Sequence, residues 1–232
     1  MSKVWLVGIT ESKVPGVPSI NDLLAHIARV SNPGNQMNTS TAPKLLKYLV
    51  KNKHWSPFEM AHMVLGIDTT RDIARQMLRH RSFAFQEFSQ RYADASELGF
   101  ETREARMQDP KNRQASLTTT DEEIHNIWQA MQSDALRSAK RAYSWAISNG
   151  IAKEQARAVL PEGMTHSRLY MAGSIRSWIH FCEVRCDMAT QKEHREVADQ
   201  CKAILMTELP ALAEILGYED RTDQPQPTPS ST

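Results

Sequence analysis

The sequence has few cysteines and no long hydrophobic run. Its three cysteines, Cys182, Cys186 and Cys201, are too few for the disulfide framework of a small secreted protein. No further Cys or His completes a metal-ligand spacing around them, so we expect buried free thiols and no metal. Nowhere do about 18 apolar residues follow one another, and no basic and apolar leader opens the chain. We therefore expect neither a membrane span nor a signal peptide, and a cytoplasmic protein.

An excess of charge of either sign is also missing. The chain has 28 Lys and Arg residues against 27 Asp and Glu residues, a net charge of +1, so no overall field gathers nucleic acid or an anionic membrane. No Gly-rich dinucleotide loop is present, which argues against a Rossmann domain. Anion binding is therefore expected only at local clusters of side chains.

Hydrophobic periodicity predicts an α+β fold with more helix than strand, in which long helices pack on a small mixed or antiparallel sheet. We expect a single domain over residues 1–222 and a disordered Pro- and Ser-rich tail over residues 223–232. Strands are predicted at 3–9 and 60–68. Helices are predicted at 19–30, 43–52, 71–81, 120–149, 153–159, 174–186 and 191–209, with a resumption after Pro210.

Two local predictions are more specific. Residues 82–92 alternate incompletely, since Phe83 and Phe85 fall on one face and Phe88 on the other, and this favours an extended loop over a regular strand. Thr120 and Glu123 have the spacing of a capping box, which predicts that the long helix begins at Thr120.

The most informative stretch runs from Arg71 to Tyr92. Arg71, Arg75 and Arg79 are spaced by four on one predicted helix, where like charges destabilise a helix by about 0.2–0.5 kcal/mol per pair, so an anion is expected to offset them. A solvated basic face near a helix C-terminus is the ordinary explanation. The nearby imidazole, carboxylate and hydroxyl groups favour a second one, recognition of a phosphate together with a polar ring.

Arg79-His80-Arg81, seven further residues and then Ser89 form the pattern RHR-x7-S, with Gln76, Glu87 and Arg91 around it. This pattern resembles the signature of the flavin-dependent thymidylate synthases, the ThyX family. Matching blocks occur in order at 55–59 (WSPFE), at 156–161 (ARAVLP) and around Arg176 and Arg185, so the resemblance covers roughly residues 40 to 200.

The resemblance implies residues for two ligands. It implies that FAD is bound by Ser56, Arg79, His80, Arg81, Glu87, Ser174, Arg176 and His180. It implies that dUMP is bound by Gln76, Arg79, Glu87, Ser89, Gln90, Arg91, Arg157 and Arg185. Of these, Arg185 is the expected catalytic residue, because a permanent positive charge beside the uracil ring stabilises the negative charge that forms when N3 loses its proton.

The activity implied is reductive methylation of dUMP to dTMP. Methylenetetrahydrofolate is the implied carbon donor, and FAD, reduced by NADPH, is the implied redox carrier. No Ser-His-Asp or Cys-His arrangement is recognisable, which agrees with a family that needs no protein nucleophile. The expected partners are these small molecules and further copies of the chain, in a homotetramer whose subunits share the sites, and neither nucleic acid nor a membrane.

The sequence departs from the common family pattern at several positions. Ala84 and Gln86 stand where many members have Ser and Asn, His180 stands where others have Asn, and the Asn expected near residues 172–174 is missing. Two alternatives therefore stay open. One keeps the fold and cofactor but methylates UMP or transfers a hydroxymethyl group. The other is a nucleic-acid-binding module that stacks bases on Phe83, Phe85 and Phe88.

Overall fold

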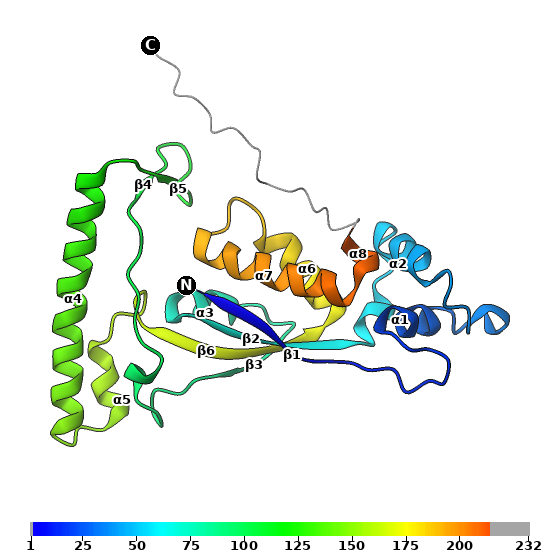
Figure 1. Cartoon of the computed structure of the whole chain (residues 1–232), viewed down its shortest axis with the longest axis horizontal. Coiled ribbons are helices and arrows are strands. Elements are labelled where there is room, and N and C mark those ends of the chain that lie inside the picture. The colour runs from blue at the N-terminus through cyan, green and yellow to red at the C-terminus, as the bar shows by residue number, and fades with distance from the viewer. Residues whose placement is uncertain (1, 214–232) are drawn as a thin grey trace, which may run out of the picture.

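A four-stranded antiparallel sheet forms the centre of the molecule (Figure 1). The computed structural model describes residues 2–213, so the predicted tail at 223–232 lies outside the described residues. The strands lie in the order β1 (Lys3–Ile9), β2 (His62–Thr70), β6 (His166–Ser174) and β3 (Ala84–Glu87). Together with the helices that pack on this sheet, they confirm the predicted α+β class.

Alternation along the strands sets which face of the sheet is buried. Met63, Leu65 and Ile67 of β2 point into the core and are fully buried, and their neighbours on β6 are Gly173, Met171 and Leu169. On the opposite face the indole of Trp5 lies across Gly66, where an added Cβ would come within 2.2 Å of the ring. Glycine at this position therefore lets a large ring cover the strand.

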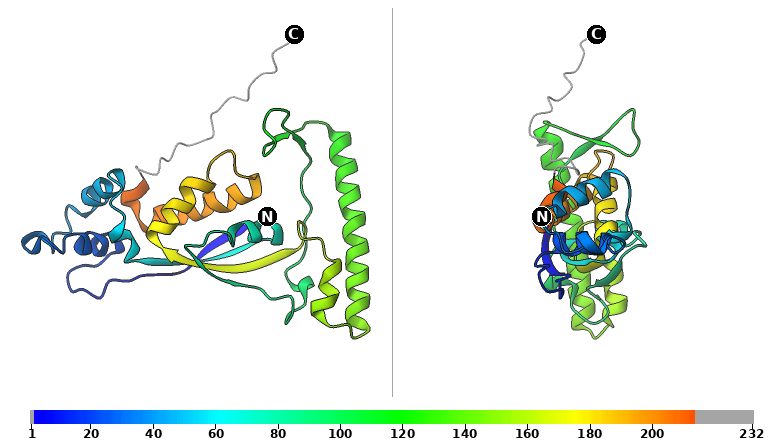
Figure 2. Two further views of the ribbon diagram at one scale, coloured as in Figure 1. Left: turned by 180° about the vertical axis from the view of Figure 1, so that it is seen from behind. Right: turned by 90° about the vertical axis from the view of Figure 1, so that its right-hand side faces the viewer.

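Helices α6 and α7 lie along one face of this sheet, while α1 and α2 flank one end of it and α4 and α5 the other (Figures 1 and 2). The α-helices are α1 (Ile20–Ala28), α2 (Ala42–Lys51), α3 (Arg71–Met77), α4 (Glu122–Ser148), α5 (Lys153–Ala156), α6 (Ile175–Arg185), α7 (Lys192–Glu208) and α8 (Pro210–Ala213). Short 3-10 turns lie at η1 (Pro33–Asn35), η2 (Ser56–Glu59), η3 (Ala95–Glu97) and η4 (Arg157–Val159). No helix of residues 2–213 is long and apolar enough to cross a membrane.

The structure corrects the prediction for residues 82–92, because Ala84–Glu87 forms the edge strand β3. Phe83 and Phe85 pack against the core, and pairing with β6 orders a segment whose own alternation is weak. A small hairpin of β4 (Arg106–Gln108) and β5 (Ser116–Thr118) is also present. It was not predicted, because three-residue strands are too short to show a period.

The long helix α4 is capped one residue later than predicted. The carboxylate of Asp121 accepts hydrogen bonds from the backbone N–H groups of Glu123 and Ile124, at 3.0 and 3.1 Å. The predicted capping box at Thr120 is therefore wrong, because Asp121 fills the same role with a charge that also suits the positive end of the helix dipole.

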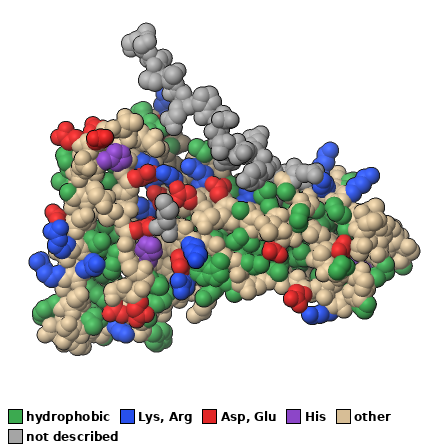
Figure 3. All heavy atoms as spheres, viewed as in Figure 1, with side chains coloured by type: hydrophobic (Ala, Val, Ile, Leu, Met, Phe, Trp, Pro, Cys, Tyr) green, Lys and Arg blue, Asp and Glu red, His purple; other side chains and the backbone are tan. Residues whose placement is uncertain are grey.

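One face of α4 has apolar side chains open to solvent. Ile127, Trp128, Met131 and Trp145 are between 42% and 63% exposed, and Figure 3 shows hydrophobic groups among the charged ones on this side of the molecule.

All three cysteines are buried free thiols, as predicted.

Removing the cap tests this description of α4. We expect Asp121→Ala to lower the free energy of unfolding by about 1 kcal/mol, because two backbone donors lose their acceptor. Urea denaturation followed by circular dichroism measures the change. Thr120→Ala is the matched control, and an equal loss in that variant would restore Thr120 as the cap.

Candidate active site

Helix α3 carries the first residues of the predicted site, and its early arginines are matched by carboxylates of the same chain. Arg71 lies 3.4 Å from Glu87 and 3.6 Å from Glu162, and Arg75 lies 2.6 Å from Glu162. These two carboxylates are the anions expected to offset the arginine series. In the described part of the chain, the exposed Arg79 has no such carboxylate partner.

Past the C-terminal end of α3, His80 contacts the predicted catalytic arginine. The Nε of Arg185, on the last turn of α6, donates a hydrogen bond of 2.8 Å to Nε2 of His80. Burial, followed by the positive charge of Arg185, lowers the pKa of His80 to about 4. The imidazole is therefore neutral at pH 7, and because Nε2 accepts, its proton lies on Nδ1. A neutral histidine can orient the guanidinium without repelling it.

Gln76 belongs to the same group of side chains. Its Nε2 donates to Oε1 of Gln191 at 2.8 Å, and its Oε1 lies 3.2 Å from Nδ1 of His194. His194 is fully buried, and burial, followed by the charges of Arg185 and His80, lowers its pKa to about 3. Gln191 and His194 belong to no recognised motif and were not predicted from the sequence. We name this group of Gln76, Arg79, His80 and Arg185 the first cluster.

We name the other residues predicted to bind dUMP, Glu87, Ser89, Gln90, Arg91 and Arg157, the second cluster. Glu87 accepts a hydrogen bond of 2.6 Å from Ser167, and Arg91 donates to Glu154 of α5 at 3.1 Å. Gln90 is 3% exposed, and its Nε2 has no hydrogen-bond partner among the described residues. Buried donors are normally paired, so this amide is available to an acceptor from outside residues 2–213.

Within residues 2–213 no hydrogen bond or ion pair joins the first cluster to the second. Glu87 contacts Arg71 at the start of α3, whereas His80 contacts Arg185 beyond its end, and the intervening helix is about 9 Å long at 1.5 Å per residue. In Figure 1, α5 and α4 lie at one end of the sheet and α6 lies over it. Each chain therefore presents two halves of the predicted dUMP site at separate places.

A third group surrounds the start of α6. Ser174 caps this helix, accepting from the N–H of Ser177 at 3.2 Å, and its hydroxyl donates to Glu59 at 2.6 Å. Arg176 lines two cavities. One, of about 390 Å3, is also lined by Ser82, Ala84, Ala172 and Ser174, and the other, of about 250 Å3, by Lys53, Trp55, His180 and Glu183.

These cavities fit the flavin predicted from the sequence. Arg176, which lies 3.7 Å from Glu59, and Lys53 supply positive charge that suits a diphosphate. The indole of Trp55 supplies a flat wall. Ser56, exposed on η2, follows Trp55 directly in the chain. Ala84 and Ala172, two positions at which the family pattern departs, line the larger cavity. Small side chains there leave room and remove polar contacts from that wall.

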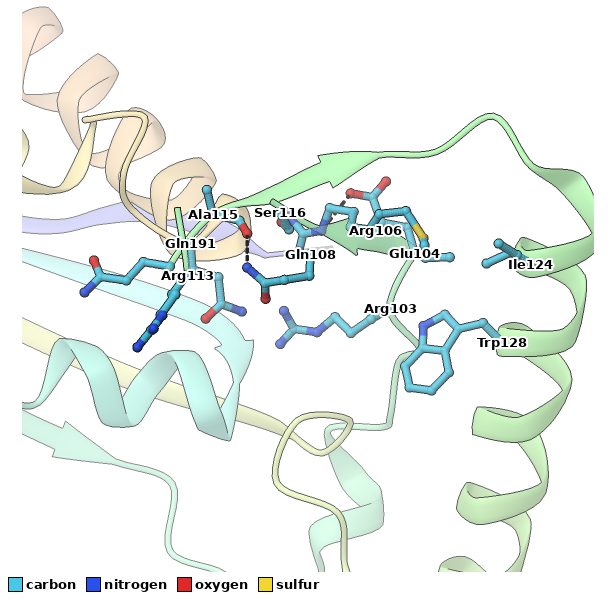
Figure 4. Close-up of a pocket in the computed structure, with 13 residues that line it drawn as sticks. Arg103, Glu104, Arg106, Gln108, Arg113, Ala115, Ser116, Ile124, Trp128 and Gln191 are labelled. Atoms are coloured by element: carbon cyan, nitrogen blue, oxygen red, sulfur yellow. Dashed lines mark hydrogen bonds and ion pairs between the residues drawn. The ribbon is translucent and has the colours of Figure 1, made fainter. Parts of the chain in front are cut away.

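The cavity in Figure 4 is larger but contains none of the predicted site residues. It measures about 550 Å3 and lies between the β4–β5 hairpin and Trp128 of α4. Its Arg103 and Arg106 both pair with Glu193. Burial alone would raise the pKa of Glu193, but hydrogen bonds from Arg106 and Gln191 outweigh it and lower the pKa to about 2. The charges of Arg103 and Arg106 are therefore already offset by a carboxylate of the same chain.

Other predictions can be compared with these positions. Phe83 packs edge-on against Trp178 with ring centroids 4.8 Å apart, and this core contact contradicts the proposed base-stacking platform. Within the described chain, no group of three or more His, Cys, Asp or Glu side chains is placed to hold a metal ion.

Comparisons with known proteins show the family to which the chain belongs. The sequence model of Thy1, described as thymidylate synthase complementing protein, matches residues 17–211. The chain is 47% identical over 213 residues to a probable flavin-dependent thymidylate synthase of Paramecium bursaria Chlorella virus 1, covering 92% of this chain and 98% of that one. It belongs to the Thy1 family of flavin-dependent thymidylate synthases.

Two further relatives place this Thy1 protein among known structures and sequences. It is 50% identical over 209 residues to the flavin-dependent thymidylate synthase of Synechocystis, covering 90% of this chain and 95% of that one. The crystal structure of PolB from Streptomyces cacaoi, a UMP/dUMP methylase bound with 5-Br dUMP, superimposes with a TM-score of 0.77 at 27% identity. That match covers 91% of this chain and 92% of PolB.

The buried histidine of this Thy1 protein predicts a pH effect. The unfolded chain protonates His194 near pH 6.5 and the folded chain only near pH 3. Stability should therefore fall as the pH drops from 6.5 to 4.5, by roughly 1.4 kcal/mol per pH unit from this group. His80, whose pKa is lowered to about 4, adds a similar slope in the same window. Glu193 adds little in this window, because its lowered pKa affects stability below about pH 4.5.

Urea unfolding at a fixed protein concentration measures the slope. We expect His194→Asn to reduce the slope by about half, because His80 still contributes its share, whereas His54→Asn, at an exposed position, should keep the wild-type slope. Equal slopes in wild type and His194→Asn would show that folding does not lower the pKa of His194.

Proposed function

We propose that this protein methylates dUMP to dTMP, with FAD as cofactor, methylenetetrahydrofolate as carbon donor and NADPH as reductant. The observation that carries the proposal is the pairing of Arg185 with a neutral His80 beside Gln76, in a chain of the flavin-dependent thymidylate synthase family. That pairing holds a fixed positive charge next to a polar amide, which suits a pyrimidine ring.

Arg185 is the catalytic residue of this proposal. Its hydrogen bond to His80 uses Nε, which leaves the two Nη groups to face the uracil. The guanidinium stays charged at any working pH, so it stabilises the negative charge that forms as N3 of the pyrimidine loses its proton. That charge increases electron density at C5, where the new carbon is attached.

The nucleotide is shared between the two clusters. Gln76, Arg79 and Arg185 of the first cluster hold the base. Arg91 and Ser89 hold the phosphate, since an arginine fork and a hydroxyl are good phosphate donors, and Glu87, Gln90 and Arg157 complete the second cluster. Arg91 would exchange its contact with Glu154 for the phosphate.

FAD is held by Ser56, Arg79, His80, Arg81, Glu87, Ser174, Arg176 and His180. Ser174, Arg176 and His180 already lie at the two adjoining cavities, and Arg79 and Arg81 are exposed cations at the end of α3. When bound, reduced FAD supplies the reducing equivalents for methylation. The chain supplies the binding, the orientation and the charges.

We infer that a complete nucleotide site is built from two subunits. The clusters lie near opposite ends of α3, and the first cluster of one chain would meet the second cluster of another. The exposed apolar side chains of α4 give surface for such assembly. We propose a homotetramer in the cytosol, where buried free thiols persist.

The main alternative keeps the fold and changes the sugar of the substrate. The structurally similar PolB is named a UMP/dUMP methylase, so UMP is a specific second candidate. The relatives at 47% and 50% identity are named thymidylate synthases, which favours dUMP.

An anaerobic turnover assay tests the reaction. Purified protein with FAD, NADPH, methylenetetrahydrofolate and dUMP should form dTMP, detected by mass. UMP in the same assay should give less than about one-tenth of that rate, because the side chains packed around the sugar would have to accommodate the additional hydroxyl of UMP. Bound flavin without dTMP would reject the proposed reaction, and a faster reaction with UMP would reject the proposed substrate.

Mixing two inactive variants tests the shared site. We expect Arg185→Ala to abolish methylation while retaining FAD, and Arg91→Ala to lose activity through weak dUMP binding. After unfolding and refolding together in equal amounts, about a quarter of the sites should join one intact first cluster to one intact second cluster. Activity should return to that level. If the mixture stays inactive while mixed oligomers form, each site belongs to a single chain.

A further inference from the structure

We propose that His194 and Gln191 are positioning residues that fix the orientation of the Gln76 amide for the pyrimidine nucleotide. The proposal rests on the proposed function, because it assumes that Gln76 contacts dUMP. It assigns a role to His194 of α7 and to Gln191, the residue just before that helix. Neither residue belongs to a recognised motif.

The direction of every hydrogen bond in this group follows from one ionised carboxylate. Glu193 is paired with Arg103 and Arg106 and can only accept, so the amide of Gln191 turns its Nε2 toward Glu193, at 2.9 Å. Its Oε1 then faces Gln76 and accepts from Nε2 of Gln76 at 2.8 Å. The carboxylate thereby sets which end of each amide points which way.

The same direction continues to His194. With its Nε2 committed to Gln191, Gln76 turns Oε1 toward Nδ1 of His194, 3.2 Å away. Nδ1 must then carry the proton, because two facing lone pairs would repel. The other ring nitrogen, Nε2, is buried without a partner among residues 2–213. An unprotonated Nε2 agrees with that site, since a buried N–H without an acceptor would cost more.

Packing holds this imidazole in place. His194 is fully buried, with Phe181 at 5.9 Å and His80 at 6.4 Å between ring centroids. Phe181 lies on α6 and His80 follows α3, so the ring is packed between the two elements that carry the first cluster. A shift of His194 would therefore disturb both Gln76 and the neighbour of Arg185.

A fixed orientation matters because the two ends of an amide have the same shape and opposite hydrogen-bonding properties. Gln76 is only half-buried, and without its two partners it could turn either end toward the nucleotide. Held by Gln191 and His194, it keeps one N–H and one oxygen lone pair for the ligand in a single arrangement. Because the side chain is ordered before the nucleotide binds, the entropy cost of ordering it is not subtracted from the binding free energy.

Three variants of the full-length, FAD-loaded protein separate orientation from packing. His194→Leu removes the donor but fills the space, whereas His194→Asn keeps an N–H at the distance of Nδ1. Gln191→Ala removes the other contact at an exposed position that tolerates change. The dissociation constant of dUMP is measured by calorimetry, and flavin content and thermal unfolding are recorded for each variant.

We expect His194→Leu and Gln191→Ala to weaken dUMP binding about five- to tenfold, as for the loss of one hydrogen bond. His194→Asn should stay within about twofold of wild type. KM for dUMP should rise in proportion with kcat nearly unchanged, and flavin content should not change. Unchanged dUMP affinity in a folded His194→Leu protein, or no rescue by Asn, would overturn the proposal.

A double-mutant cycle shows whether Gln76 transmits the effect. In a Gln76→Ala background, His194→Leu should cause no further loss of dUMP affinity. An equal loss in both backgrounds would mean that His194 acts independently of Gln76. Wild-type protein that retains FAD and binds no dUMP would instead reject the proposed function, and the positioning role with it.

Discussion

The antiparallel pairing of β2 with β6 is the constraint from which the first cluster follows. Thr70, the last residue of β2, pairs with His166, the first of β6, and His62 pairs with Ser174. Helices α3 and α6 therefore leave the sheet from opposite ends. The paired strands span about 30 Å, and the two helices together are about 27 Å long, so helices that run back over the sheet bring their C-termini together.

The meeting of two helix C-termini also explains how several cations can stand close to one another. Each C-terminus carries a partial negative charge, which offsets part of the repulsion between Arg79 and Arg185. The N-terminus of α3 carries no such negative charge. There, carboxylates of the chain form ion pairs with Arg71 and Arg75 instead. Charges along one short helix are thus divided between structural ion pairs and cations left for ligands.

Much of this could be predicted from local pattern alone. The alternation of β2 and the apolar spacing of α6 each depend on neighbouring residues, and both elements are where the sequence places them. The RHR-x7-S motif indicated the right family, because the order of its residues in the chain is fixed. Its two ends lie in different clusters, however, since β3 carries Glu87 away from His80. That separation depends on tertiary packing, which cannot be predicted from the spacing of residues along the chain.

The residues missed by the sequence share a physical cause. Gln191 and His194 act through contacts with Gln76, more than 100 residues earlier in the chain, and ordinary polar residues at the start of a helix give no sign of such partners. Asp121 was missed for a simpler reason. Neighbouring Asp and Thr residues are both good caps, and only the backbone geometry decides between them.

The long separation between β2 and β6 has a kinetic consequence. Asp68 and Arg168, which are paired across these strands, lie 100 residues apart, and the whole of α4 lies between them. At about 5–20 residues per second, synthesis leaves β2 without its inner neighbour for several seconds. During that interval one edge of the β1–β2 pair is open to other chains. That edge is closed only when β6 has been made and pairs with β2.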